Sequence, residues 1–239
     1  MSTNGESNVR YPSITLYTNH GCPWAHRVHI ILSELQLPYK EEIIDLSIPR
    51  HPSYLSINHR GLVPSLVYDG EIITESAIVA QFLADAHPSH IVKTSSEPGG
   101  ALQRARISFF VDAVINKANP HFHAGIRASN EWEREDAGRA FIAAVVKEVE
   151  PLLKDANPFF GGSSRLTLAE VQTGSFVLRY MSYSKYGLQA KNLMSELEAE
   201  TPNFYKWANA VVKERSVNYI WNEKEVVERT KARISALSK

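Results

Sequence analysis

Hydrophobic positions recur with two different periods along this chain, and the first third combines both. SITLYT (residues 13–18) and EEIIDL (residues 41–46) are short β-rich runs that predict two strands. Between them apolar residues recur at i, i+3, i+4 and i+7, which is the spacing of one helical face. These residues are Val28, Ile31, Leu32 and Leu35. A right-handed crossover of this kind makes the two strands parallel.

The following residues predict a short helix or irregular turn, a hairpin and a second long helix. PSYLSINH (residues 52–59) is the short helix or turn. PSLVYDGEIITES (residues 64–76) contains two apolar runs joined by Asp69-Gly70, a strong hairpin signal. A helix follows from about Ser76 to His87. Its inner side is predicted to carry Ile78, Val79, Phe82, Leu83 and Ala86. This order of elements is the plan of a thioredoxin-like α+β domain, although other small α/β sheets share the periodicity.

The composition and the hydrophobic pattern change at HPSHIVKTSSEPGG (residues 87–100). This stretch is rich in Ser, Pro and Gly and predicts a linker. Beyond it the apolar period is helical throughout, which predicts an all-α bundle. Two stripes carry this pattern: Ile142, Val145, Val146, Val149, Leu152 and Leu153 in one, and Phe204, Trp207, Ala208 and Val211 in the other. LTLAEV (residues 166–171) predicts a capping box in which Thr167 caps and Glu170 bonds back.

We therefore expect an α+β thioredoxin-like domain followed by an all-helical domain. The predicted boundaries are a disordered leader at 1–12, the first domain at 13–87, a linker at 88–100 and the helical domain at 101–239.

Composition and charge exclude several classes of function. Lys plus Arg balances Asp plus Glu at 26 against 26, so no strong field of one sign exists to attract nucleic acid or an anionic membrane. The N-terminus MSTNGESNVRYPS lacks the apolar region of a secretory signal, and no apolar run is long enough to span a bilayer. A cytoplasmic protein without nucleic-acid or membrane partners is expected.

Cys22 is the single cysteine, in HGCPWAHRVHI (residues 20–30), where the first strand gives way to the first helix. Pro23 suits the first helical position, and the free N–H groups and helix dipole there favour thiolate over thiol. His20, His26 and Arg27 are near in sequence, but on a helix the last two can point outward. The competing interpretation is a small buried hydrophobe. Position favours a working thiol, because strand-to-helix junctions in α/β folds face the site.

Three motifs together resemble the cytosolic glutathione transferases, especially the cysteine-type omega class. The motifs are GCPWAHR (residues 21–27), GLVPSL (61–66) and ESAIVAQFL (75–83), with LTLAEV in support. The resemblance covers nearly the whole chain after residue 12, and its specificity lies in the order and spacing of the motifs. CPWAHR also resembles the glutathionyl-hydroquinone reductases, which usually carry further terminal segments. The capping box of these transferases usually ends in Asp, where this chain has Glu170.

The resemblance implies a glutathione site in the first domain. Pro64 would be cis, leaving the backbone of Val63 to pair with the cysteinyl backbone of glutathione like an added strand. Glu75 would take the ammonium of the γ-glutamyl end. Ser76 and the N-terminus of its helix would take the α-carboxylate. Considered alone, Glu75-Ser76 is an ordinary helix start and Pro64 a loop proline.

Two further residues complete the implied site. Arg50 aligns loosely with the basic residue near the glycyl end, and alone it is a solvated charge. Trp24 stands where the family places an aromatic wall. The electrophile site would lie between the domains, with candidates Trp24, Phe109, Phe110, His121, Phe122, His123, Tyr180, Tyr183 and Trp221. No metal is expected, since an isolated His121/His123 pair lacks further ligands.

The implied chemistry is thiol transfer at Cys22. The thiolate would form a mixed disulfide with glutathione, and a second glutathione would resolve it because there is no second cysteine. Thioltransferase, dehydroascorbate reductase and detoxifying activities follow from the resemblance. The second substrate would be a hydrophobic electrophile or a glutathionylated small molecule, and a homodimer is expected. The alternatives are a transferase dedicated to one electrophilic metabolite and a non-catalytic glutathione-binding scaffold.

Overall fold

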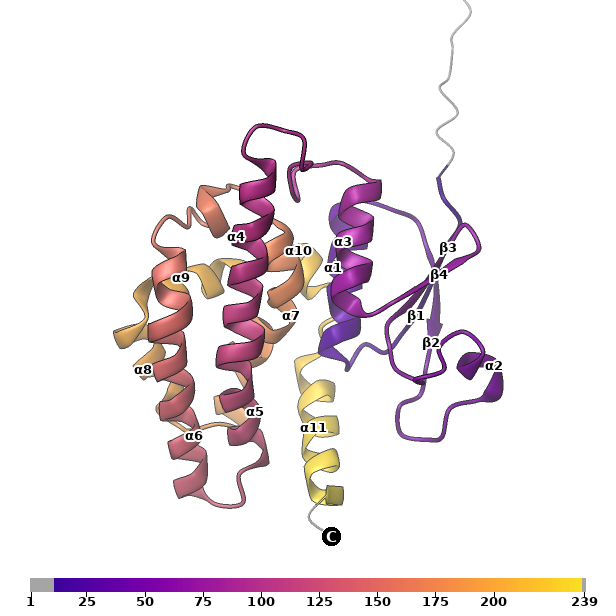
Figure 1. The fold of residues 1–239 in the computed structure, drawn as a ribbon. Helices are drawn as coiled ribbons and strands as arrows, with labels where there is room; N and C mark the ends of the chain where they lie inside the picture. Colours follow the sequence, from indigo (N-terminus) through magenta and orange to yellow (C-terminus); the bar gives the residue numbers. More distant parts are fainter. Residues whose placement is uncertain (1–10, 238–239) are drawn as a thin grey trace, which may run out of the picture.

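The computed structural model describes residues 11–237, which form a small sheet with its helices and then a helical domain (Figure 1). The leader predicted at 1–12 lies, up to residue 10, outside the described residues. Among residues 11–237, none of the helices combines the length and apolarity needed to cross a bilayer.

The sheet has four strands in the order β2-β1-β3-β4. They are β1 (Ile14–Thr18), β2 (Lys40–Ile43), β3 (Ser65–Tyr68) and β4 (Glu71–Thr74). β1 runs parallel to β2 and antiparallel to β3, and β3 runs antiparallel to β4. The hairpin turn has φ of 48° at Asp69 and 93° at Gly70, the two left-handed positions of a tight hairpin. The predicted crossover and hairpin are both confirmed.

Helices α1 (Pro23–Glu34) and α3 (Ser76–Ala86) lie between the sheet and the helical domain (Figure 1), and the short α2 (Pro52–Leu55) lies beyond the sheet's other face. α1 packs on α3, on α7 (Leu168–Ser182) and on α10 (Arg215–Asn218). Every residue from Ala25 to Leu32 is therefore buried. The helix has no solvent-facing stripe along this stretch, because one side meets the sheet and the other meets the second domain.

The helical domain begins at Gly100. Its elements are α4 (Gly100–Asp112), η1 (Ala113–Ala118), α5 (Asn119–Arg127), α6 (Glu131–Ala144), η2 (Val145–Val149), η3 (Glu150–Leu153), η4 (Phe160–Gly162), α7 (Leu168–Ser182), η5 (Tyr183–Tyr186), α8 (Leu193–Glu200), α9 (Pro202–Val211), α10 (Arg215–Asn218) and α11 (Glu223–Leu237). The connection before α4 is packed rather than loose. Ile91 and Val92 are buried, and the Leu168 N–H donates to the Ile91 carbonyl at 2.9 Å.

α7 is the centre of the second domain and is buried from Leu168 to Tyr180. The predicted capping box is confirmed at its start. The carboxylate of Glu170 accepts from the Thr167 N–H at 2.8 Å and from the indole N–H of Trp207 at 2.7 Å. Glu in place of Asp therefore caps the helix normally, and it also ties α7 to α9.

Three predicted inward positions are wrong. Ile78 is 59% exposed, because the buried face of α3 is centred on Val79 and Leu83 instead. Ala86, at the exposed end of α3, also faces solvent. Val146 is 39% exposed, because residues 145–149 form a π-helical turn that shifts the phase of the stripe.

Candidate thiol site

Cys22 lies between the end of β1 and the first turn of α1. It is the N-cap residue of α1 and has an extended backbone, with Pro23 at the first helical position as predicted. The Cys22 N–H donates to the Asn19 carbonyl at 2.9 Å, which fixes the turn before the helix. The thiol is free and lies 3.9 Å from the Val63 carbonyl oxygen. The sulfur thus faces both the start of α1 and the loop before β3.

Opposing effects act on the Cys22 thiol. Burial is the largest and raises its pKa above the ordinary value. The N–H groups of Ala25 and Trp24 lower the pKa, as do the positive charges of Arg179 and Arg233. The predicted influence of the helix N-terminus on the thiol pKa is present, but desolvation outweighs it. A thiolate here is stabilised first by these N–H groups and then by the two arginines.

His26 and Arg27 point inward, contrary to the outward orientation that the sequence allowed. Arg27 is 2% exposed and donates to the Gln172 carbonyl at 2.6 Å and to the Ser76 hydroxyl at 3.3 Å. Burial lowers its pKa to about 10, and the Cys22 charge opposes that shift. Both side chains are inward because α1 has a protein neighbour on each side.

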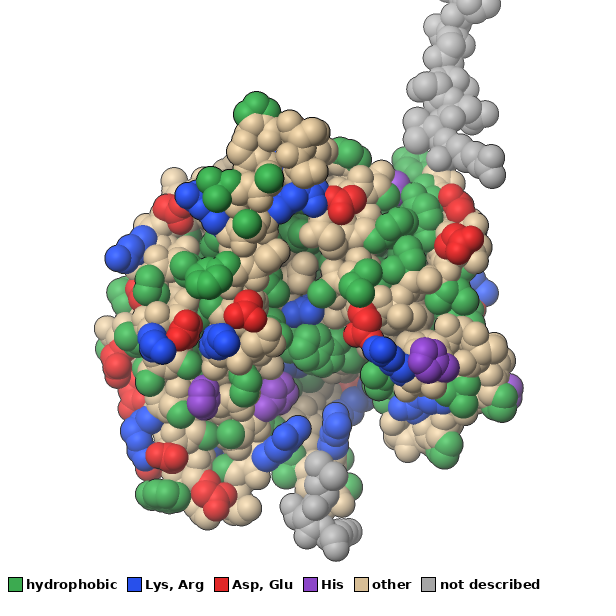
Figure 2. All heavy atoms as spheres, viewed as in Figure 1, with side chains coloured by type: hydrophobic (Ala, Val, Ile, Leu, Met, Phe, Trp, Pro, Cys, Tyr) green, Lys and Arg blue, Asp and Glu red, His purple; other side chains and the backbone are tan. Residues whose placement is uncertain are grey.

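The helical domain supplies two further cations to the thiol. Arg179 on α7 is buried and donates to the Gly21 carbonyl at 3.0 Å, one residue from Cys22. Its guanidinium also lies over the ring of Trp221 at 4.9 Å. Arg233 on α11 is exposed. Figure 2 shows a hollow between the two domains beside α11, with lysine and arginine side chains along it. Sequence reasoning missed both arginines, because no local motif links them to Cys22.

The loop before β3 and the start of α3 form the other wall. The Val63–Pro64 peptide is cis, as expected, and Val63 is buried. Glu75 has φ of 67°, a left-handed conformation that is costly for a residue with a Cβ. Ser76 begins α3 and is 6% exposed. A strained backbone held at a helix N-terminus is typical of functional sites.

Two arginines of this wall have defined partners. Arg60 lies 2.5 Å from the Glu75 carboxylate, a pairing that the sequence analysis missed. Arg50 donates to the carbonyl oxygens of Gly61 at 3.0 Å and Asp45 at 2.7 Å, and to that of Ile48. The guanidinium of Arg50 therefore organises the loop between β2 and α2.

Trp24 is 39% exposed and stacks edge-on against Phe176, with ring centroids 4.8 Å apart. Arg27 lies over its ring at 4.6 Å. The structure separates the candidates for the electrophile site. Four of them are core residues with at most 2% exposure: Phe110, Phe122, Tyr180 and Tyr183. They pack there because each belongs to the buried face of its helix.

The remaining candidates differ in surroundings. His121 is exposed and His123 half-buried. The two do not share a helical face, because they are two residues apart on α5. The pKa of His123 is lowered chiefly by burial and also by the charges of Arg127, Arg179 and Arg233. Phe109 is 59% exposed on α4.

Fold and site together define a class of protein: a thioredoxin-like sheet with a cis-proline loop and a cysteine at a helix start, followed by a helical domain. Residues 21–86 match the family model described as glutathione S-transferase, N-terminal domain. A probable glutathione transferase omega-2 of Caenorhabditis briggsae is 28% identical over 173 residues, covering 70% of this chain and 65% of that protein. The chain thus spans just under two thirds of the nematode protein.

Other relatives are matched over more of their length. Glutathione S-transferase omega-1 of Sus scrofa is 26% identical over 207 residues, covering 86% of this chain and 79% of that protein. Glutathione transferase Omega 2C from Trametes versicolor superposes with a TM-score of 0.77 at 26% identity, covering 94% of this chain and 99% of that one. Rice GST1, solved with glutathione, shares the fold with a TM-score of 0.81 at 23% identity, covering 95% and 98%. Residues 21–86 are thus similar to the N-terminal domain of glutathione S-transferases, and the described fold as a whole is similar to that of glutathione transferases.

Proposed function

We propose that this protein is a glutathione-dependent thiol transferase that uses Cys22 as its nucleophile. The observation that carries the proposal is the position of the thiol. It lies at the N-terminus of α1, opposite the Val63 carbonyl, and within the influence of Arg179 and Arg233. A thiolate at a helix start beside cations is the arrangement that activates cysteine nucleophiles.

Glutathione is the proposed co-substrate, and it lies along the cis-proline loop. The Val63 backbone pairs with its cysteinyl unit, and the N-terminus of α3 with Ser76 takes the γ-glutamyl carboxylate. Glu75 takes the ammonium, with Arg60 holding the carboxylate in place until glutathione arrives. Arg50 shapes the loop at the glycyl end of glutathione and contributes positive charge there. Trp24 forms an aromatic wall beside the sulfur atom of glutathione.

The proposed reaction is a balanced exchange of disulfides. The Cys22 thiolate attacks the glutathionyl sulfur of a mixed disulfide. That S–S bond breaks, the substrate thiolate leaves, and a Cys22–glutathione disulfide forms. The thiolate of a second glutathione then attacks this bond, releasing glutathione disulfide and the Cys22 thiolate. The second step requires glutathione because the chain has one cysteine.

A second candidate, transfer of glutathione to one dedicated electrophilic metabolite, is favoured by a specific observation. Burial raises the pKa of the Cys22 thiol, which reduces the thiolate available for general exchange. Such an enzyme would bind glutathione but ignore small mixed disulfides. A non-catalytic scaffold would bind glutathione and turn over neither substrate.

We also propose a homodimer. A groove of about 480 Å³ lies between α3 and α4, and Ile78 and Val111 are among the residues that line it. The side chain of Ile78 is 59% exposed there. Residues of both domains line the groove, so a second copy of the chain bound there would contact both domains.

Light scattering should report a dimer for the wild type and a monomer for Ile78→Glu. Trp132→Glu, at a 68% exposed position on α6, should stay dimeric. A monomeric wild type would refute this assembly.

The test of the function is glutathione-dependent reduction of a small glutathionyl mixed disulfide by the wild type and by Cys22→Ser. We expect clear turnover that the substitution abolishes, while calorimetric titration still detects glutathione binding to the variant. Turnover that survives in Cys22→Ser would exclude the thiol mechanism. An inert wild type that binds glutathione would favour the dedicated transferase or the scaffold.

A further inference from the structure

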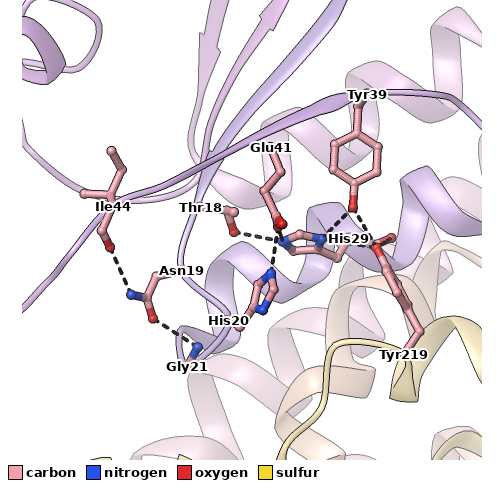
Figure 3. A network of polar contacts seen from close by, with 9 residues as sticks. All are labelled: Thr18, Asn19, His20, Gly21, His29, Tyr39, Glu41, Ile44 and Tyr219. Atoms are coloured by element: carbon pink, nitrogen blue, oxygen red, sulfur yellow. Dashed lines mark hydrogen bonds and ion pairs between the residues drawn. The ribbon is translucent and has the colours of Figure 1, made fainter.

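Beside the thiol site, three side chains from separate elements converge on one point (Figure 3). His20 follows β1, His29 is on α1 and Glu41 is on β2. The Nε2 atom of His20 lies 2.7 Å from Oε1 of Glu41, and Nε2 of His29 lies 3.4 Å from the same oxygen. The three ligand atoms lie within 4.8 Å of one another. No part of the proposed thiol transfer uses this cluster.

The far side of His29 is held by two tyrosines. Tyr219 donates its hydroxyl hydrogen to the His29 carbonyl at 3.0 Å. Nδ1 of His29 lies 3.0 Å from the Tyr39 hydroxyl and 3.1 Å from that of Tyr219, and the two hydroxyls are 3.1 Å apart. One arrangement satisfies all these groups: Tyr39 donates to Tyr219, and the His29 Nδ1–H donates to Tyr39.

That arrangement leaves the lone pair of His29 Nε2 facing the Glu41 carboxylate. A ring N–H held by an outer partner, with the other nitrogen free, is how metal-binding histidines are oriented in proteins. The Thr18 hydroxyl lies 2.9 Å from the same Nε2 and donates to its lone pair in this tautomer, so a metal ion there would displace that hydrogen bond.

The loop that carries His20 is also fixed. The side chain of Asn19 donates to the Ile44 carbonyl at 2.9 Å and accepts from the Gly21 N–H at 3.0 Å (Figure 3). These bonds hold the turn after β1 against the strand that carries Glu41. The side chains of His20 and Glu41 are 43% and 32% exposed, so an ion can reach them from solvent.

We propose that His20, His29 and Glu41 form a binding site for a first-row divalent metal ion of the zinc type. Two imidazole nitrogens and one carboxylate oxygen are a donor set that zinc accepts, whereas magnesium and calcium prefer oxygen alone. The ion takes the position between the three atoms, and His20 then carries its proton on Nδ1. Three protein ligands leave one coordination position open for water. This site goes beyond the proposed thiol transfer and does not depend on it.

The test is calorimetric titration of ZnCl₂ into the full chain after chelator treatment and desalting, in a Cys22→Ser background that removes the thiol as a competing ligand. Saturation with one ion per chain is expected. His20→Ala and Glu41→Gln should each weaken binding by at least about 10- to 100-fold, the loss that even outer partners of metal ligands cause. Both positions are partly exposed, so the variants keep the core intact.

Two further variants make the assignment specific. Tyr219→Phe should weaken zinc binding by about 10-fold, because it loosens the orientation of His29. His121→Ala, at an exposed histidine on α5, should bind like the parent. Cobalt(II) should give visible d–d bands that are lost in His20→Ala and are the same whether or not the chain carries Cys22→Ser. Absence of saturable zinc binding, or binding that His20→Ala and Glu41→Gln leave intact, would overturn the proposal.

Discussion

Replacing Arg179 with methionine should make Cys22 less reactive without moving the cysteine. Arg179 is buried, so its charge is poorly screened, and it donates to the carbonyl one residue before Cys22. Its charge lowers the pKa of the thiol against the larger effect of burial. Methionine has a similar length and no charge. The thiol pKa of Arg179→Met should therefore rise.

The size of the effect follows from the geometry. An opposite charge close to a titrating group favours its charged form by about 10- to 1000-fold. Because Arg179 contacts the neighbouring residue rather than the sulfur, we expect the lower end, an alkylation rate at neutral pH reduced by about 10-fold. Two carbonyls, of Gly21 and Ser175, lose their donor. Unfolding free energy should fall by about 2–5 kcal/mol as a result.

The assay is alkylation by iodoacetamide as a function of pH, in buffer with a chelator, followed by intact mass. The single cysteine makes the readout specific. Arg179→Lys keeps the charge and should stay within about 3-fold of the wild type. Arg233→Met removes an exposed charge, so its smaller effect should vanish at about 1 M salt, where the screening length is about 3 Å. Coinciding pH profiles for wild type and a folded Arg179→Met would refute this electrostatic account.

Three other predictions follow from single residues. Glu170→Ala leaves buried donors of Thr167 and Trp207 without an acceptor, and urea unfolding should show a loss of about 4 kcal/mol or more; a loss below about 1 kcal/mol would contradict the buried network. Burial holds the pKa of His26 well below its ordinary value, so the unfolded state binds the extra proton and stability falls as pH drops below about 6.5, by about 1.4 kcal/mol per unit from this residue. His26→Gln should remove this contribution from the slope in urea titrations, and an unchanged slope would show that His26 does not contribute to it. Glu75→Gln should raise KM for glutathione by about 10-fold with kcat nearly unchanged; an unaltered KM would remove Glu75 from the glutathione site.

Local signals in the sequence were enough for the sheet and for part of the site. Asp69-Gly70 specifies its hairpin through two left-handed φ values, and Thr167 with Glu170 specifies the start of α7 through bonds between neighbours. Cys22 before Pro23 marks the helix start in the same way. In each of these cases the deciding interaction lies within a few residues along the chain.

The parts of the site that the sequence did not predict depend on contacts between distant segments of the chain. Arg179 meets Gly21 across 158 residues, and Tyr219 meets His29 across 190. No periodicity encodes which helix of the second domain lies over α1. The inward orientation of Arg27 follows from that packing, because only the second domain removes the solvent face of α1. The partner of Glu75 was missed for a similar reason, since Arg60 belongs to another loop.

The most direct test of the central claim is to trap the Cys22–glutathione disulfide. The protein is mixed with a glutathionyl mixed disulfide in the absence of free glutathione and measured by intact mass spectrometry. One glutathione per chain should appear on the peptide that contains Cys22, and added glutathione should release it. A wild type that stays unmodified, or an adduct that glutathione cannot remove, would contradict the proposed cycle.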